Sequence, residues 1–390
     1  MARIVHLADN HFNLGSRFDE CVKMHGIVSE YVRREKPDAV AYSGDLFDGA
    51  SNPIEREAVA EHVQENAQIA PVIVDRGNHD RVLDLAILRR LRAPHPIWVC
   101  EEPRVITVGS VAFGVLPWPR KAGIHAVADG LGLPASELEA QEALRSILRW
   151  MGSELDETGL PKMLVTHAMV DGSVTSHGQP LVGADMNIGL TDLALANADA
   201  YALGHIHKHQ HWMIGDAPAV YPGSPYRTAF GELEPKGFVV WHIERGRATW
   251  EFIELPAAKM MLIDVDWQPE HVGLPGDSIV SAGFSQEFDF SGMFAAEIRF
   301  RYRVAAEHQK IARAAAEDLK RKALLVGAIS FQIEPVVQVT TRERSPEIAE
   351  ASTLQDQIKA YWKSTNNYPE PPVEQRLLGK LAILESEAAN

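Results

Sequence analysis

The sequence predicts an α/β protein with a layered main domain, a smaller α+β domain and a helical tail. Short β-branched runs alternate with helical stretches up to about residue 255, which is typical of layers of sheet and helix. Beyond that point strands are grouped around one helix, and the chain ends in two short amphipathic helices. A chain of 390 residues is also too long for one average domain.

The elements of the main domain, residues 1–255, follow from their residue patterns. We expect strands where β-branched apolar residues run together, and helices where apolar residues recur at intervals of three and four. The expected strands are RIVHLA, DAVAYS, PVIVD, KMLVTH and DAYALG, and the expected helices cover residues 18–36, 54–68 and 136–157.

The second domain is expected over residues 258–342 and the tail over residues 350–390. The second domain should contain the strand MMLIDVDW, a Gly/Pro/Ser-rich connection, the strand AEIRFRYRV, a helix over 306–325 and the strand AISFQIEPVVQV. The tail should contain helices over 352–363 and 373–387, separated by the Pro-rich NNYPEPP.

The bulk composition indicates a globular protein without a membrane segment. Apolar residues make up 46% and charged residues 23%, and no apolar run is long enough to cross a bilayer. The N-terminus MARIVHLAD begins with a strand pattern instead of a secretory signal, so we expect a cytoplasmic protein. Two cysteines in no metal spacing exclude a disulfide framework and a thiolate metal site. The net charge of -15 argues against unaided, tight binding to a polyanion.

Side chains that bind metals follow five of the expected strands, in the stretches ADNH, SGDLFD, RGNHD, VTHAM and LGHIH. Because functional loops of such a sheet lie at the carboxyl ends of its strands, we expect the five stretches to converge on one edge. The polar residues that they contribute are Asp9, His11, Asp45, Asp48, Asn78, His79, Asp80, His167, His205 and His207.

These residue types indicate two borderline divalent ions. Carboxylates, an amide carbonyl and imidazoles suit Mn, Fe or Zn better than Ca or Mg, and they suffice for two ions that clamp a phosphate and activate a water. Asp45 is the expected bridging ligand. Gly44, Gly77 and Gly204 precede three of the motifs, where they allow sharp turns and close approach of the main chain. His79 is the expected proton source for the leaving oxygen.

Together, DNH, GDLFD, GNHD, His167 and GHIH resemble the five-motif signature of the calcineurin-like metallophosphoesterases, and ALGHIHK and YPGSP are similar to the SbcD nuclease branch. The resemblance implies a layered β-sandwich metallophosphoesterase domain flanked by helices, a small capping domain that contacts DNA, and a helical tail that docks onto an ATPase. It also implies 3'-to-5' exonuclease and endonuclease activity on DNA, two manganese ions, an SbcC-like coiled-coil ATPase partner and a homodimer within that complex, in a bacterial cell or a phage-infected host.

The resemblance also implies a role for each matching residue. His79 would act on the leaving group without binding a metal, and Asp48 would orient His79. One ion would be held by Asp9, His11, Asp45 and His207, and the other by Asp45, Asn78, His167 and His205.

Several polar residues next to these motifs have a second interpretation. Asp48 and Asp80 also fit solvated carboxylates in turns. His209 and His211 share the strand alternation of the last two ligands, but a two-metal site is complete without them, so we expect surface or packing histidines.

The chain also departs from the family pattern at three positions. Ala8 stands where Ser is usual, Asn10 where many relatives have Trp, and His209 where Pro is common. Ala8 and Asn10 are not ligands, so we expect changes at the rim of the site and not an inactive site.

Cations in two regions are candidates for DNA contact. In EIRFRYRV, alternation places three arginines on one face of a strand, either as a phosphate-contacting stripe or as a solvated face balanced by neighbouring acids. Three further cations adjoin the metal-binding motifs. The candidates are Arg81, Lys208, Arg227, Arg299, Arg301 and Arg303.

The tail carries one apolar stripe on each helix. The stripes would either dock onto a partner's coiled coil, which we favour, or pack on each other and the body. They consist of Leu354, Ile358, Tyr361 and Trp362 in the first helix and Val373, Leu377, Leu381 and Leu384 in the second.

The leading functional hypothesis is therefore a two-metal DNA nuclease in an SbcCD-like DNA end-processing and repair complex. One alternative is a metallophosphoesterase for small phosphate esters or phosphoproteins, which the acidic composition favours. The other is a DNA-end-binding scaffold in which the metal site matters little.

Overall fold

A computed structural model describes residues 1–15, 17–133, 139–176, 186–272, 282–284, 290–338, 346–349, 351 and 353–388. Several expected features reach beyond these residues. They are the start of the helix over 136–157, most of the Gly/Pro/Ser-rich connection, the domain boundaries at residues 342 and 350, and the first residue of the helix over 352–363.

Two six-stranded sheets form the main domain, and each consists mainly of parallel strands. The five strands expected from the sequence all form, as β1, β2, β3, β7 and β10. In spatial order, the first sheet contains β14 (Arg247–Glu254), β13 (Gly237–Glu244), β1 (Ala2–Leu7), β2 (Ala39–Ser43), β3 (Val72–Asp75) and β4 (Ile97–Cys100). The second contains β11 (Gln210–Ile214), β12 (Ala217–Tyr221), β10 (Ala200–Gly204), β7 (Lys162–His167), β6 (Val111–Leu116) and β5 (Arg104–Val108).

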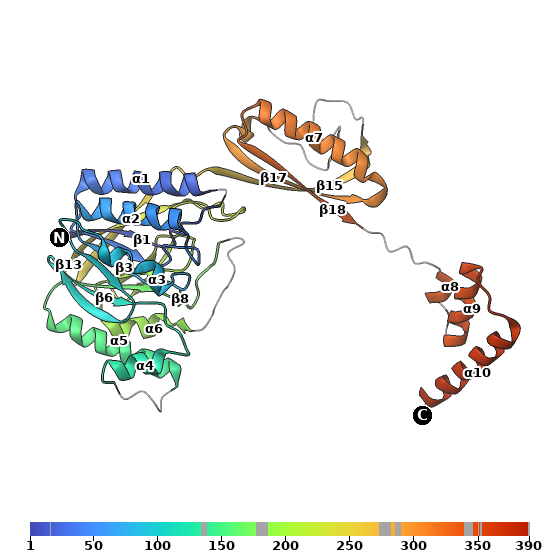
Figure 1. Ribbon diagram of the computed structural model, residues 1–390, viewed down its shortest axis with the longest axis horizontal. Helices are drawn as coiled ribbons and strands as arrows, with labels where there is room; N and C mark the ends of the chain where they lie inside the picture. Colours follow the sequence, from blue (N-terminus) through green and yellow to red (C-terminus); the bar gives the residue numbers. More distant parts are fainter. Residues whose placement is uncertain are drawn as a thin grey trace. The chain divides into compact units, whose positions relative to one another are not determined.

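Alternation along the strands explains why the sheets stack in layers. In β2, Ala39 and Ala41 belong to the core shared with the second sheet, whereas Val40 and Tyr42 face the core under the first layer of helices. That layer contains α1 (Phe18–Glu35) and α2 (Pro53–Ala67). The opposite layer contains α4 (Ile124–Gly130), α5 (Ala140–Glu157) and α6 (Leu190–Leu193), so the domain is a β-sandwich between helices, as expected (Figure 1).

The packing of the sheets brings the carboxyl ends of strands from both sheets together. The parallel pairs β1–β2 and β2–β3 end at one edge of the first sheet, and the parallel pair β7–β10 ends at one edge of the second. Strand β2 lies close to both β7 and β10 in the facing sheet. Loops that follow strands far apart in the sequence therefore meet at the end of β2.

Beyond the sandwich, the chain forms a four-stranded sheet, one long helix and a helical tail. The sheet has the order β16 (Ala282–Phe284), β15 (Lys259–Val272), β17 (Ala296–Ala305), β18 (Ser330–Gln338). Helix α7 (Gln309–Leu325) buries Ala312, Ala316 and Leu319, at helical spacing. The tail contains α8 (Pro346–Ala349), α9 (Leu354–Thr365) and α10 (Pro371–Ala388), of which α8 was not expected.

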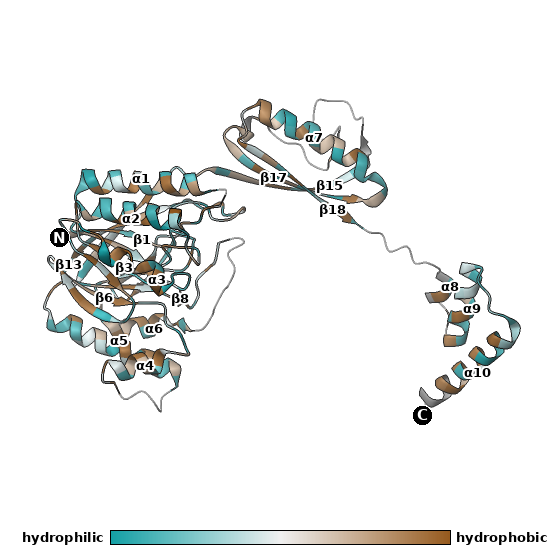
Figure 2. Ribbon diagram, viewed as in Figure 1, coloured by the Kyte–Doolittle hydropathy of each residue, from teal (hydrophilic) through white to brown (hydrophobic). Residues whose placement is uncertain are grey.

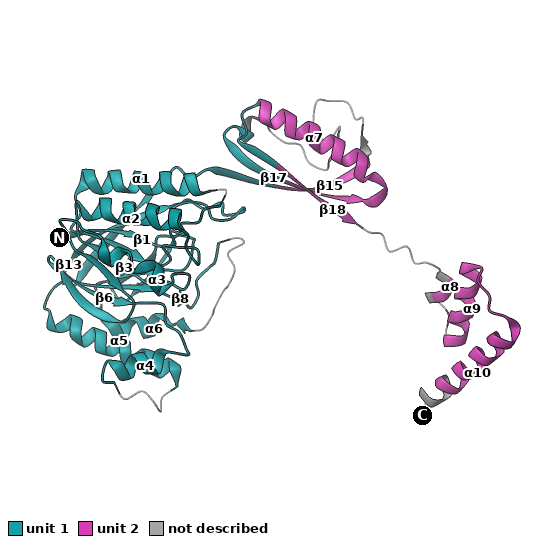
Figure 3. Cartoon of the chain, in the orientation of Figure 1, with its two compact units in different colours: residues 1–262, 291–299, 326–331 teal, residues 263–290, 300–325, 332–390 magenta. Residues whose placement is uncertain are grey.

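The chain divides into two compact units (Figure 3). One contains Met1–Leu262, Ser291–Arg299 and Val326–Phe331, and the other Ile263–Phe290, Phe300–Leu325 and Gln332–Asn390. The expected division into three parts, 1–255, 258–342 and 350–390, stays a prediction.

The tail helices differ in how much apolar surface they expose. Trp362 of α9 is buried, whereas Val373, Leu377 and Leu384 of α10 are exposed, and apolar and polar residues mix along α10 (Figure 2). Among the residues described, no helix has both the length and the apolar character needed to cross a bilayer.

Candidate metal centre

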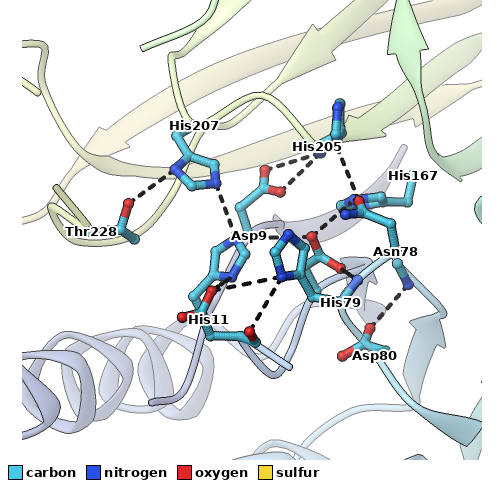
Figure 4. A network of polar contacts seen from close by, with 12 residues as sticks. Asp9, His11, Asn78, His79, Asp80, His167, His205, His207 and Thr228 are labelled. Atoms are coloured by element: carbon cyan, nitrogen blue, oxygen red, sulfur yellow. Dashed lines mark hydrogen bonds and ion pairs between the residues drawn. The ribbon is translucent and has the colours of Figure 1, made fainter. Parts of the chain in front are cut away.

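The seven expected ligands lie together where the strands of the main domain end. His167 is the last residue of β7, and the others lie in the loops that follow β1, β2, β3 and β10. Their polar atoms point toward one another (Figure 4). Side chains from positions spread over about 200 residues of sequence thus form one cluster, which consists of Asp9, His11, Asp45, Asn78, His167, His205 and His207.

Two carboxylates lie in the middle of this cluster. Oδ2 of Asp45 is 3.1 Å from Nε2 of His167 and 3.9 Å from Nε2 of His11. Asp9 has an oxygen within 4.8 Å of ligand atoms in two groups, one with His11 and His207 and one with Asp45 and His167. A third group of potential ligands consists of His11, Asp48 and His79, so the three groups overlap through Asp9 and His11.

The nitrogens and oxygens of the cluster face one another in a way that fits divalent cations. Nε2 of His11 lies 3.0 Å from Nε2 of His207, so at most one proton separates the two imidazoles unless they share an ion. Oδ1 of Asn78 is 2.9 Å from Nε2 of His167 and 3.1 Å from Nδ1 of His205. Carboxylate, imidazole and amide oxygen together form the donor set that borderline divalent ions prefer, so the residues fit such ions.

Four residues of the cluster have a left-handed backbone. The φ angles are 53° at Asp9, 42° at His11, 52° at Asp45 and 111° at His205. This region is disfavoured for side chains other than glycine and is found at sites where the surroundings impose it. Main-chain bonds hold the loops in place, because the amides of Asn10 and His11 both donate to the carbonyl of Asp45, at 2.8 and 3.0 Å.

The three motif glycines provide space for close approach, and one of them also forms a left-handed turn. Gly44 has a φ of 79°, and a Cβ there would lie 2.3 Å from Nδ1 of His167. At Gly77 a Cβ would lie 2.0 Å from Oδ1 of Asp45, and at Gly204 1.8 Å from the carbonyl oxygen of Ser43. Only Gly44 needs the left-handed turn, whereas Gly77 and Gly204 let β3 and β10 approach the end of β2.

Burial and charge act in opposite directions on the cluster. Burial alone would lower the pKa of His11 and His167, but the side chain of Asp48 and the charge of Asp45 raise that of His11 to about 9. The charge and hydrogen bond of Asp45 raise the pKa of His167 to about 10. Burial and the charge of His167 lower the pKa of His205 to about 3. The buried carboxylates thus attract positive charge, which protons or metal ions can supply.

His79 lies at the open side of the cluster, and Asp48 contacts it less closely than it contacts His11. The main-chain amide of His79 donates to Oδ1 of Asp45 at 2.8 Å, and its Nδ1 is 3.3 Å from the carbonyl oxygen of Asp48. Oδ1 of Asp48 is 3.8 Å from Nδ1 of His79 but 3.1 Å from Nδ1 of His11. The proposed orienting acid therefore holds His11 first, and the main-chain oxygen is the nearer acceptor for His79.

A buried charge network behind His207 was not expected from the sequence. Nδ1 of His207 is 3.0 Å from Oγ1 of Thr228 and 3.2 Å from Oε1 of Glu232. Nζ of Lys236 lies 2.9 Å from Oε2 of Glu232, with both side chains fully buried, and donates to the carbonyl of His207 at 3.0 Å. The only signal in the sequence was the charged stretch GELEPK after YPGSPYRTAF, which is typical of a solvated loop.

Residues next to the ligands have structural roles. Asp80 is buried and accepts from the amides of Phe47 and Gly77, each at 3.0 Å, so it is not a solvated carboxylate. His209 donates to the carbonyl of Tyr221 at 2.8 Å and stacks on Phe252. His211 packs against Trp250, which confirms that neither histidine joins the cluster.

Asn10 is not at the rim of the site, and the expectation that it would be was wrong. Both Ala8 and Asn10 are fully buried. The Asn10 side chain lies 2.9 Å from Nε2 of His25 in α1, and Nδ1 of His25 donates to the carbonyl of Cys21. Asn10 thus ties the first ligand loop to the helix behind it, where an indole would need a different arrangement of the helix.

Most of the cations considered for DNA contact already have partners. The guanidinium group of Arg227 donates to the main-chain oxygens of Glu232, Glu234 and Ala258, so its role is structural. Alternation in β17 is confirmed, because Phe300 and Tyr302 are buried and the three arginines that alternate with them are only partly buried. Arg301 pairs with Glu334, Arg303 with Asp264 and Asp266, and Arg299 lies over Phe230. For Arg301 and Arg303, these ion pairs favour the interpretation as a solvated strand face balanced by neighbouring acids. Of the other candidates, Arg81 is exposed and Lys208 is partly exposed.

The sequence has relatives of known family. The SbcD subunit of the SbcCD nuclease of Bacillus subtilis is 25% identical over 396 residues, which cover 95% of this chain and 95% of the relative. The protein of the same name from Staphylococcus saprophyticus is 23% identical, covering 68% of this chain and 72% of the relative. The DNA double-strand break repair protein Mre11 of Aeropyrum pernix is 24% identical, covering 68% of this chain and 64% of the relative.

The calcineurin-like phosphoesterase family matches residues 2–209, a segment that contains all seven residues of the cluster. The match covers the cluster at the strand ends and the part of the sandwich up to β10, whereas β11 to β14 follow it. With more than half of its length matched, the chain belongs to the calcineurin-like phosphoesterase family.

Proposed function

We propose that this chain is a metal-dependent DNA nuclease, a 3'-to-5' exonuclease and endonuclease that serves as the nuclease component of an SbcCD-like complex. The observation that carries the proposal is the cluster of seven ligands in a calcineurin-like domain, within a chain that aligns over 95% of its length with the SbcD nuclease of Bacillus subtilis. The small second sheet and the tail fall within that alignment, whereas a phosphatase for small substrates needs neither.

Two divalent ions are proposed, which the mixed oxygen and nitrogen donors fit, with manganese as the native metal because the resemblance to the SbcD nuclease branch implies it. When bound, the pair would clamp a phosphate and lower the pKa of a water. Asp45 is the proposed shared ligand, and the position of Asp9 in two groups fits a second bridging role. One ion would be held by Asp9, His11, Asp45 and His207, and the other by Asp45, Asn78, His167 and His205.

His79 is proposed as the proton donor to the leaving sugar oxygen. Its ring is partly exposed, with 29% of the side chain accessible, so that a substrate oxygen can reach it. Its main chain is fixed by Asp45, and its Nδ1 faces Asp48, which leaves Nε2 for the substrate.

The experiment that tests the function compares three substrates under one condition. Purified full-length protein with manganese is given duplex DNA, a cyclic nucleotide and bis(p-nitrophenyl) phosphate. We expect duplex DNA to have the highest kcat/KM. Faster turnover of the cyclic nucleotide than of DNA would favour the small-ester alternative, for which the net charge of -15 is the supporting observation.

The proposed partners are DNA, a coiled-coil ATPase of the SbcC type and a second copy of this chain within the complex. The exposed apolar residues of α10 are the proposed ATPase contact. An ATPase partner would also supply positive charge toward DNA, which offsets the net charge of -15 of this chain. The proposed location is the cytoplasm of a bacterial cell or of a phage-infected host, where DNA is accessible.

A further inference from the structure

A cavity lined by arginines adjoins the metal centre on the side of His79. Its volume is about 480 Å³, and Asn78 and His79 form the wall next to the cluster. Arg76, Arg81 and Arg120 contribute to the remaining wall, together with Gly49, Asp80 and Val82. Arg76 and Arg81 flank the GNHD motif in the sequence, while Arg120 comes from the loop after β6.

The three guanidinium groups lack acidic partners within the described parts of the chain. None of them forms an ion pair there, and Nε of Arg76 is buried without an acceptor. Among the acids nearby, Glu101 pairs with Arg89 and Asp80 accepts from two main-chain amides. Asp75 is fully buried, and burial raises its pKa well above the usual range, which favours its neutral form. Three like charges around one cavity, in a chain with a net charge of -15, favour an anion as its occupant.

The cavity on the other side of the cluster has a different charge balance. It has a volume of about 190 Å³ and is lined by His11, Asp48 and Arg17, among others. Its one arginine, Arg17, is paired with both Glu20 and Glu297. Of these two cavities, the one on the His79 side is the one whose described arginines lack acidic partners.

We propose that Arg76, Arg81 and Arg120 bind the phosphate group that neighbours the scissile phosphate on the leaving-group side. The proposal rests on the proposed nuclease function, and it assigns the phosphate to the leaving side because His79, the proposed proton donor, lines the same cavity. Arginine suits this task, since its planar donors match two phosphate oxygens at once.

An apolar pocket beside this cavity extends the proposed subsite. The pocket has a volume of about 110 Å³, shares Arg76 and Arg120 with the cavity, and is otherwise lined mainly by apolar side chains such as Trp118, Ile124 and Val127. Trp118 also packs against His205, with the ring centres 4.7 Å apart. A phosphate on the two shared arginines would place its sugar or base against this pocket, so the arginines would position the strand as well as attract it.

The test compares substrates that differ by a single phosphate. Full-length wild type and the variants Arg120→Gln and Arg76→Gln are assayed with manganese on a thymidine dinucleotide, on the same dinucleotide carrying a phosphate at either end, and on bis(p-nitrophenyl) phosphate. We expect one terminal phosphate to lower the wild-type KM by about tenfold, and each variant to lose that advantage while keeping its kcat. Bis(p-nitrophenyl) phosphate has no neighbouring phosphate, so its kcat/KM should be the same in wild type and variants.

Two further variants separate charge from folding. Arg120→Lys should recover part of the advantage, because it keeps the charge but not the planar fork. Arg247→Gln, at an exposed position of β14, is the matched control and should behave as wild type.

The outcomes distinguish this proposal from the proposed function. If wild type cleaves the dinucleotides but neither terminal phosphate lowers KM, or if both glutamine variants retain the advantage, the arginine subsite is refuted and the nuclease stands. If wild type hydrolyses bis(p-nitrophenyl) phosphate and no dinucleotide or longer DNA, the nuclease function is refuted and the subsite with it.

Discussion

Nε2 of His11 lies 3.0 Å from Nε2 of His207, although 196 residues separate the two histidines. Each ring is held from behind, His11 by Asp48 at 3.1 Å and His207 by Thr228 and Glu232. Partners on the far nitrogens fix the ring orientation and leave the facing nitrogens for a common ion. The orientation of the two imidazole ligands, and with it the metal affinity of the site, therefore depends on Thr228 and Glu232, which are not proposed ligands.

Replacing Glu232 by glutamine should weaken metal binding by about 10- to 100-fold, because the partner that orients His207 loses its charge. The same change leaves the buried Lys236 with Glu234 as its remaining carboxylate partner, which should also lower the free energy of unfolding, by about 1 to 3 kcal/mol. Manganese affinity is measured by titration calorimetry, and stability by urea unfolding in EDTA.

A double variant separates these two effects. Glu232→Gln with Lys236→Met removes the buried charge and should recover stability, while metal affinity stays low. If metal affinity returned together with stability, Glu232 would act through the fold alone and not through the orientation of His207.

Replacing His79 by alanine should lower kcat on DNA by about 100- to 10,000-fold, the usual contribution of a general acid. Metal content should not change, because His79 is not a proposed ligand. Metal is measured by mass spectrometry and activity by release of nucleotides. His211→Ala, an exposed histidine of β11, is the control. Equal activity of wild type and His79→Ala would exclude the proposed role.

Replacing Asp45 by asparagine should remove most of the bound metal and all measurable nuclease activity. Asparagine keeps the size of the side chain and one carbonyl oxygen, so that the amide of His79 retains an acceptor. Far-UV circular dichroism checks the fold, and complementation of a strain that lacks the nuclease checks function. Full complementation by this variant would instead support the DNA-end-binding scaffold.

Buried histidines should make the protein sensitive to acid. Burial lowers the pKa of His25 to about 4, and burial together with the charge of His209 lowers that of His6 to about 3. The unfolded chain takes up these protons near pH 6.5 while the folded chain does not, so stability is present above about pH 6.5 and is lost as the pH falls toward 4. The loss is on the order of 3 kcal/mol for His25 and on the order of 5 kcal/mol for His6, whose loss is complete only near pH 3.

His25→Gln isolates one of these contributions. In urea unfolding with EDTA, the variant should lose less stability than wild type between about pH 6.5 and 5, because it has one proton fewer to take up. The difference between the two proteins is the relevant quantity, since other histidines titrate in both. Parallel curves would show that the pKa of His25 is the same in the folded and unfolded states, which contradicts its lowered pKa in the folded protein.

Acidic substitutions on the exposed stripe of α10 should abolish binding of the ATPase partner and leave hydrolysis of bis(p-nitrophenyl) phosphate unchanged. The test variant is Leu377→Asp with Leu384→Asp, two residues that are 42% and 55% exposed. Gln375→Asp with Ala382→Asp adds the same charge to the opposite face of the helix. Co-purification with the ATPase is the measurement, and equal loss in both variants would argue against a specific apolar contact.

The sequence was sufficient to predict which residues gather at the site, because each ligand follows a strand that its own pattern reveals. β-Branched runs define β1, β2 and β3, and glycines mark where two segments of the main chain approach closely. The order of motifs then places Asp9, Asp45 and Asn78 at the same edge. The marginal strands β11 and β14 are less apolar and were not expected. Strands β6 and β13 were not expected either, although they are apolar and buried.

The supporting residues were not predictable in the same way. Glu232 and Lys236 form a buried pair only because the loop folds over His207, and their charges in sequence resemble those of any solvated loop. Arg227 adjoins a motif but donates to main-chain oxygens that the sequence does not place near it. Local patterns reveal periodicity and turns, whereas these contacts depend on tertiary packing.

Because the backbone is left-handed at Asp9, His11, Asp45 and His205, we expect bound ions to raise the stability of the folded domain. Each such residue carries a cost of about 1 to 3 kcal/mol, which contacts elsewhere have to offset. Ions that bind these side chains in the folded state and not in the unfolded state would stabilise the whole domain. The supply of divalent metal in the cell would then set how long the protein survives proteolysis, in addition to its rate of hydrolysis.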